Sequence, residues 1–179
     1  MAKINWKKIH RFQENKDWCG PAIIQMVLKA VGFRKSQKEI AKDVYIKWWG
    51  TTQQMLIAYL SRFFKNIRYK RNSSIADISR NLNKGYIVIV NWWDDLDASD
   101  ADGHYTIVSK YDSKNKMLTM LDSSNSRQGI WKMSSKDFKD RWYDALDVHG
   151  DNWIDGWMLW IDVNSRLKKP RTDSIIRTG

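Results

Sequence analysis

The residue best suited to chemistry is Cys19, the only cysteine in the 179-residue chain. It precedes the run GPAIIQMVLKAVG, whose apolar residues recur at the spacing of a one-sided helix. Pro21 suits the first turn of that helix and Gly32 its end, so Cys19 is expected at the helix N-terminus. Unpaired N–H groups and partial positive charge there favour a thiolate. Cys19 is therefore a candidate nucleophile; the alternative is a small, buried, inert residue, as free cysteines often are.

A cysteine nucleophile needs a base, and the base needs a group that orients it. His104 opens the predicted strand 104–111, and the ends of elements are where catalytic groups tend to be displayed. Asp122 closes the predicted strand 117–122, and the turn at 112–116 makes the two strands a hairpin. The start of one antiparallel strand lies beside the end of the other, so Asp122 is expected next to His104.

Other residues compete for these two roles. Asn125 is the substitute orienter if Asp122 points elsewhere. His10 lies in the basic N-terminal stretch and His149 in the polar stretch DVHGDN, so both are weaker candidates for the base than His104.

Three further residues are expected around the site. Gln13 lies six residues before Cys19, and its side-chain amide can add a second oxyanion donor to the backbone N–H of Cys19. Trp18 precedes the nucleophile and Gly103 precedes His104, so both are expected to contact substrate.

The elements that position these residues indicate an α+β domain. The first 65 residues are predicted to be helical, with capping boxes at Ser36 and Thr51, and shorter capped helices are predicted after Ser74 and over Ser134–Tyr143. Helices followed by consecutive strands indicate an antiparallel sheet. The predicted strands, rich in β-branched and aromatic residues, are 67–70, 86–92, 104–111, 117–122 and 157–163.

Charge and length exclude several classes of protein. Residues 1–16 and 164–179 each carry +4, which leaves only +3 of the net +11 for the body of the chain and argues against nucleic-acid binding. No apolar run is long enough to cross a membrane, no signal peptide is recognisable, and no cysteine-rich zinc framework is present. We therefore expect a cytoplasmic protein with a basic segment at 1–9, one domain at 10–163 and a basic tail at 164–179, without metal or cofactor.

Two unusual features have ordinary explanations beside functional ones. The segment 94–103 (DDLDASDADG) imitates a calcium loop but lacks its glycine and glutamate, so a solvated loop or an acidic rim that favours basic peptides is the stronger interpretation. The pairs Trp48-Trp49 and Trp92-Trp93 place rings on both faces of their elements. One ring of each pair is expected near a cleft or solvent, with core packing as the simpler explanation for most of the 11 tryptophans.

The runs QENKDWCGPA (13–22), GHYTIV (103–108) and MLDSSN (120–125) together resemble the papain-like peptidases that remove double-glycine leaders from bacteriocin precursors, in their stand-alone form. The resemblance covers about residues 10–163 and implies a papain-like fold, with a helical half packed on an antiparallel sheet. It implies Cys19 as nucleophile, His104 as general base and acid, Asp122 as orienter and Gln13 as oxyanion donor.

The implied activity is peptide-bond cleavage of a peptide or protein substrate, including leader peptides. The family usually follows its aspartate with proline, whereas Ser123 and Ser124 follow Asp122 here. The alternatives are a catalytically silent peptide-binding relative and acyl transfer to an amine at the same site, as in a transpeptidase or transglutaminase. A basic adaptor for nucleic acid or acidic partners is the rival from another class.

Overall fold

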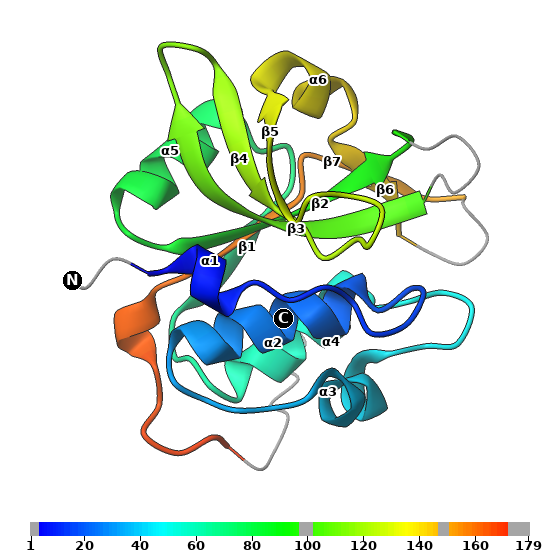
Figure 1. Ribbon diagram of the computed structural model, residues 1–179, viewed down its shortest axis with the longest axis vertical. Helices are drawn as coiled ribbons and strands as arrows, with labels where there is room; N and C mark the ends of the chain where they lie inside the picture. Colours follow the sequence, from blue (N-terminus) through cyan, green and yellow to red (C-terminus); the bar gives the residue numbers. More distant parts are fainter. Residues whose placement is uncertain (1–3, 97–101, 147–150, 172–179) are drawn as a thin grey trace.

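The computed structural model describes residues 4–96, 102–146 and 151–171. A helical layer packs against a twisted antiparallel sheet, and further helices cover the sheet's other face (Figure 1). The strand order in the six-stranded sheet is β1-β8-β2-β3-β4-β5, and a two-stranded sheet pairs β6 with β7. The strands are β1 (Ile67–Lys70), β2 (Ile87–Asp94), β3 (Asp102–Asp112), β4 (Met117–Leu121), β5 (Ile130–Ser134), β6 (Tyr143–Ala145), β7 (Trp153–Asp155) and β8 (Met158–Ile161).

Local sequence accounts for most helix boundaries. Capping boxes at Ser36 and Ser74 begin two of the helices, and Gly32 adopts a left-handed φ of 87° just after the helix that Cys19 opens. The helices are α1 (Trp6–Ile9), α2 (Cys19–Ala30), α3 (Gln37–Val44), α4 (Gln53–Ser61), α5 (Ile75–Asn83), α6 (Ser135–Asp140) and the 3-10 helix η2 (Val163–Ser165).

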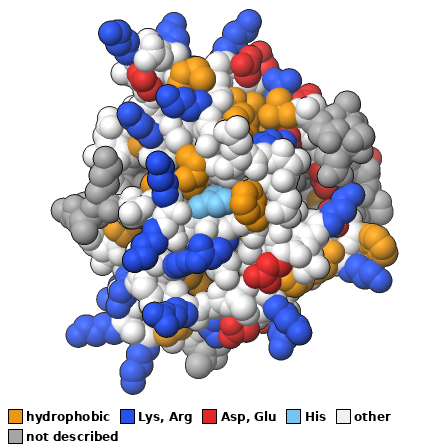
Figure 2. All heavy atoms as spheres, in the orientation of Figure 1, with side chains coloured by type: hydrophobic (Ala, Val, Ile, Leu, Met, Phe, Trp, Pro, Cys, Tyr) orange, Lys and Arg blue, Asp and Glu red, His pale blue; other side chains and the backbone are white. Residues whose placement is uncertain are grey.

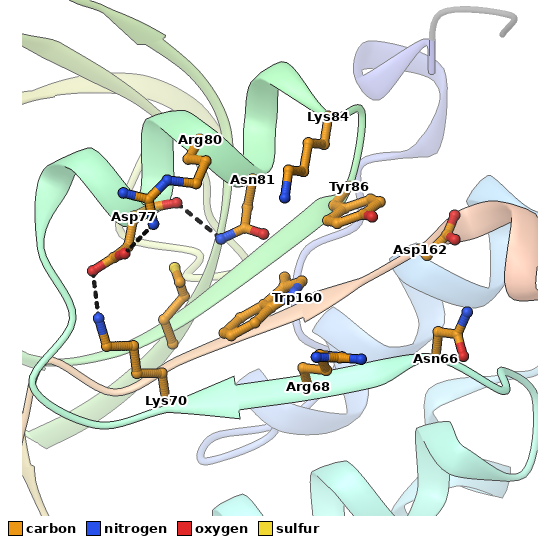
Figure 3. A pocket seen from close by; sticks show the side chains of 11 residues that line it. Asn66, Arg68, Lys70, Asp77, Arg80, Asn81, Lys84, Tyr86, Trp160 and Asp162 are labelled. Atoms are coloured by element: carbon orange, nitrogen blue, oxygen red, sulfur yellow. Dashed lines mark hydrogen bonds and ion pairs between the residues drawn. The ribbon is translucent and has the colours of Figure 1, made fainter.

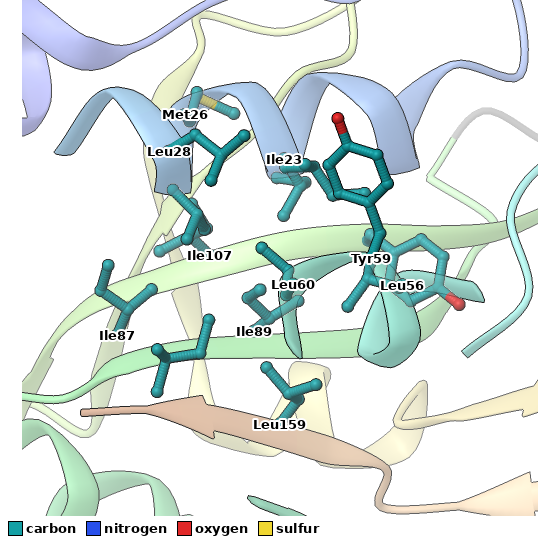
Figure 4. Close-up of a cluster of buried hydrophobic side chains, with 14 of the residues drawn as sticks. Ile23, Met26, Leu28, Leu56, Tyr59, Leu60, Ile87, Ile89, Ile107 and Leu159 are labelled. Atoms are coloured by element: carbon teal, nitrogen blue, oxygen red, sulfur yellow. The ribbon is translucent and has the colours of Figure 1, made fainter. Parts of the chain in front are cut away.

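Alternation along the central strands divides the core between the two faces of the sheet. Ile87 and Ile89 of β2 point toward α2 and α4, where the larger cluster lies (Figure 4). Val88 and Val90 point to the opposite face and pack with Ile78 of α5 and its neighbours. Because both faces of β2 are buried, the strand is almost continuously apolar.

The predicted α+β class and the hairpin at 112–116 are confirmed, since β3 pairs antiparallel with β4. Two details are corrected. The cap of α4 is Thr52, whose side chain accepts from the Met55 N–H, whereas Thr51 packs against Gly20. The helix predicted over Ser134–Tyr143 ends at Asp140, and Tyr143 begins β6.

Candidate active site

Cys19 is the first residue of α2, and only 8% of its surface is exposed. The N-cap residue Trp18 makes no side-chain capping bond, and no acceptor for the Cys19 backbone N–H occurs among the described residues. A helix start of this kind keeps N–H donors available for an anion. Gly20 allows Thr51 to approach, because a Cβ on Gly20 would lie 2.3 Å from Thr51 Oγ1.

His104 lies near the start of β3, and Asp122 directly follows β4. The antiparallel register, which pairs Ile107 with Leu121, brings the two side chains together. His104 Nε2 lies 2.7 Å from Asp122 Oδ1. Because Asp122 occupies Nε2, Nδ1 is the ring nitrogen that remains available, and His104 and Cys19 line the same small cavity.

Asp122 is fully buried, and its carboxylate is held on both oxygens. Besides His104, Oδ1 accepts the backbone N–H of Ser124 at 2.9 Å. Oδ2 accepts from Trp131 Nε1 at 3.0 Å and from Arg127 at 3.3 Å. A carboxylate with this many donors is stable as the anion and has one orientation.

The electrostatics of this pair favour an imidazolium beside a carboxylate. Burial alone would lower the pKa of His104, but the Asp122 charge and the hydrogen bonds to Asp122 and Cys19 hold that pKa well above its usual value. Burial alone would raise the pKa of Asp122, but the charge of His104, its hydrogen bond and the Ser124 N–H hold it well below its usual range.

Gln13, Cys19 and His104 all line one small cavity of about 70 Å³, which Gly103 also lines. The Gln13 side-chain oxygen accepts a hydrogen bond from Ser123 Oγ at 3.4 Å. Within the described part of the chain its Nε2 has no acceptor, so that N–H group can donate to a ligand. Ser123, the residue after Asp122, therefore helps to orient Gln13.

The competing residues that the structure describes make other contacts beside the site. Asn125 donates to the Gln13 carbonyl oxygen at 3.0 Å and not to His104. His10 Nε2 lies 2.6 Å from the backbone oxygen of Asp122 and so supports the aspartate's main chain. His149 is outside the described residues.

Trp18 takes a position different from the expected one. Its ring packs edge-on against Tyr45, and the described walls of the two cavities that contain Cys19 do not include it. Trp49 and Trp93 do line one of them, a cavity of about 280 Å³ that we call the aromatic cavity. The other member of each tryptophan pair is placed differently: Trp48 is 83% exposed, and Trp92 is fully buried. Each pair thus has a ring near a cleft or solvent, as expected.

The acidic segment 94–103 is described only in part. Asp94 forms an ion pair with Arg127, and Asp95 forms one with Arg141 at 2.5 Å. In the parts of the chain that are described, no group of three or more histidine, cysteine or acidic side chains is arranged to hold a metal ion.

A larger hollow of about 520 Å³ lies between α5 and the strands β1 and β8, and its lining contains neither Cys19 nor His104 (Figure 3). It holds several basic residues, but Asp77 forms ion pairs with Lys70 and Arg80, each at 2.8 Å. This internal compensation leaves Arg68 and Lys84 as the remaining basic residues of the lining.

Lys and Arg side chains are spread over the face shown in Figure 2 and do not follow a single groove. This distribution differs from the basic stripe of a typical nucleic-acid-binding domain. Within the described residues, none of the helices has the length and apolar character needed to cross a bilayer.

Sequence reasoning missed the residues that surround and support the His104–Asp122 pair. Arg127 and Trp131 bind the Asp122 carboxylate, and Asp144 lies against Gly103. Nothing in the local sequence marks Arg127 or Asp144, because their contacts join separate strands and loops. The one signal in the sequence is Gly103, because a glycine often marks a position where another group comes close to the backbone.

Comparison with known proteins supports the same interpretation. The model of the Peptidase_C39 like family matches residues 6–148. No match to a curated protein was found.

Solved structures show the same fold at low identity. The peptidase domain of Streptococcus ComA, a bifunctional ABC transporter of quorum sensing, is 20% identical with a TM-score of 0.61, covering 84% of this chain and 96% of that one. A C39-like peptidase from Bacillus anthracis is 12% identical with a TM-score of 0.62, covering 94% and 98%. A double-glycine-motif protease of an AMS/PCAT transporter, in complex with its leader peptide, is 14% identical with a TM-score of 0.55, covering 85% and 89%. The chain thus belongs to the Peptidase_C39 like family, as a papain-like cysteine peptidase.

Proposed function

We propose that the chain hydrolyses a peptide bond with Cys19 as nucleophile, His104 as general base and acid, Asp122 as orienter and Gln13 as oxyanion donor. The observation that carries the proposal is the convergence of three of these residues on one cavity, with His104 hydrogen-bonded at 2.7 Å to the buried Asp122. A site that only binds peptides does not need a nucleophile and a base in this arrangement.

The proposed reaction has an acylation step and a hydrolysis step. The Cys19 thiolate attacks the carbonyl carbon, and the oxyanion accepts hydrogen bonds from the Cys19 backbone N–H and Gln13 Nε2. The His104 imidazolium then gives the proton at Nδ1 to the departing amine, which leaves a thioester on Cys19. Neutral His104 takes a proton from water as the water oxygen attacks the thioester, the Cys19 thiolate is expelled, and the acid product departs, which restores the thiolate–imidazolium pair.

Leader-type peptides are the first substrate class to test, since the transporter-associated protease named above was solved with its leader peptide. The test incubates the full chain with a peptide library that includes double-glycine leaders and identifies the products by mass spectrometry. We expect new N and C termini that vanish with Cys19→Ala and His104→Ala.

Each other outcome has a definite meaning. Ligated products formed with added amines would indicate acyl transfer in place of hydrolysis. Binding of library peptides without any Cys19-dependent product would support the catalytically silent alternative and contradict the proposal.

A further inference from the structure

The aromatic cavity starts at the candidate nucleophile, because Cys19 and Gly103 both belong to its wall. Its volume of about 280 Å³ is slightly below the roughly 300–1,000 Å³ of small-molecule sites. A cavity of this size beside Cys19 suits one side chain of a bound peptide. That side chain would belong to a residue at, or one removed from, the scissile bond.

Three aspartates line this cavity, Asp17, Asp102 and Asp144, and of these only Asp144, in β6, is buried. The residue is only 9% exposed, and the backbone N–H of Ala145 donates to Asp144 Oδ1 at 2.8 Å. Gly103 makes room for it, because a Cβ on Gly103 would lie 2.3 Å from the same oxygen. The carboxylate therefore has a defined place next to the residue that precedes His104.

The Asp144 charge lacks a basic partner among the described residues, where no lysine or arginine forms an ion pair with it. Burial raises the pKa of Asp144 to about 7, with a smaller upward contribution from Asp102, against hydrogen bonds from Ala145 and Asn91 and the charge of His104, which lower it. A buried carboxylate without a cation is costly to ionise, and an incoming cation removes much of that cost.

The other walls suit the stem of a long cationic side chain. The ring centroids of Trp93 and Trp153 lie 5.4 Å apart, and Trp93 stacks on Tyr143. Trp49 forms part of the same lining. Aromatic faces bind both methylene groups and cations. Thr51 Oγ1, on the same lining, is buried without a hydrogen-bond partner among the described residues.

We propose that the aromatic cavity is a substrate subsite for a lysine or arginine side chain next to the scissile bond, with Asp144 supplying the opposite charge. The proposal rests on the peptidase function proposed above and names a substrate class for that site that carries a basic residue where a double-glycine leader has glycine. It also assigns the preference for basic peptides, which the sequence led us to expect, to Asp144, a residue outside the segment 94–103.

The test uses peptidyl acyloxymethyl ketones, in which the Cys19 sulfur displaces a carboxylate and forms a thioether, so no natural substrate is needed. Matched probes carry lysine, norleucine, glutamine or glutamate at the first or second residue from the reactive carbon. Intact-mass measurements give the rate constant for modification of the wild type, of Asp144→Asn and of the control Asp155→Asn. Asp155 lies on the neighbouring strand β7 and is not part of the cavity lining.

We expect the lysine probe to react about tenfold faster than the norleucine probe, as one charge-assisted hydrogen bond allows. The ratio should fall toward one in Asp144→Asn and persist in Asp155→Asn. In the wild type, without any mutation, the glutamate probe should react more slowly than the glutamine probe.

Several results would overturn the subsite. These are a lysine-to-norleucine ratio near one in the wild type, a ratio that Asp144→Asn leaves unchanged, or an equal fall of both rates in that variant. Failure of the peptidase function looks different, since no peptidyl probe would then modify Cys19 faster than a simple alkylating agent.

Discussion

Replacing Asp122 with asparagine tests the charge arrangement of the site most directly. The variant keeps the shape of the side chain but removes the charge that His104 Nε2 meets at 2.7 Å. Because Asp122 holds the pKa of His104 above its usual value, the change lowers that pKa and depletes the imidazolium at neutral pH. The thiolate–imidazolium pair with Cys19 then loses its stabilisation.

The size of the effect follows from the contact that is lost. A hydrogen bond to a charged group contributes about 1.5–3 kcal/mol, which corresponds to a fall of roughly 10- to 150-fold in reaction rate. The assay is alkylation of Cys19 by iodoacetamide between pH 5 and 9, followed by intact-mass spectrometry. We expect the wild type to react at acidic pH and Asp122→Asn to show the pH profile of a free cysteine, as we also expect of His104→Ala.

Asp112→Asn is the matched control, since Asp112 ends β3 at the hairpin turn and, among the described residues, its side chain bonds only to Lys114 and Asn115. Equal profiles for the wild type and Asp122→Asn would refute the ion-pair reasoning. A loss of folding in Asp122→Asn, detected by circular dichroism, would transfer the test to His104→Ala alone.

Three further predictions concern catalysis and stability. Gln13→Ala should lower kcat about 100-fold with little change in KM, because an oxyanion donor acts in the transition state; a change in KM alone would contradict that role. Ile23→Ala, at a fully buried position facing the sheet, should lower the free energy of unfolding by about 2–5 kcal/mol in urea titrations, whereas Trp48→Ala should change it by less than about 0.5. The folded-state pKa of Asp144, about 7, exceeds that of an unfolded aspartate, so the contribution of this residue to stability falls as the pH rises from about 4 to 7. Asp144→Asn should therefore stabilise the protein more at pH 8 than at pH 5. The opposite pH trend in thermal unfolding would refute this.

The sequence predicted those parts of the fold that depend on neighbouring residues. The α2 start at Cys19, the capping boxes at Ser36 and Ser74, and the hairpin that joins β3 to β4 are local, because caps and short turns are formed within a few residues. The choice between Thr51 and Thr52 as a cap was not local. Thr51 is engaged by its packing against Gly20, a contact between α2 and the segment that precedes α4.

The sequence by itself singled out the candidate residues, since Cys19 is the only cysteine and the predicted hairpin places Asp122 beside His104, where the structure has it. Tertiary structure alone decided what surrounds them. Arg127 and Trp131 bind Asp122, and Asp144 enters the cavity beside Cys19, through contacts between segments that no local pattern links. A side chain's neighbours across a packed sheet depend on strand order and on the burial of both faces, and these are settled only when the whole domain has folded.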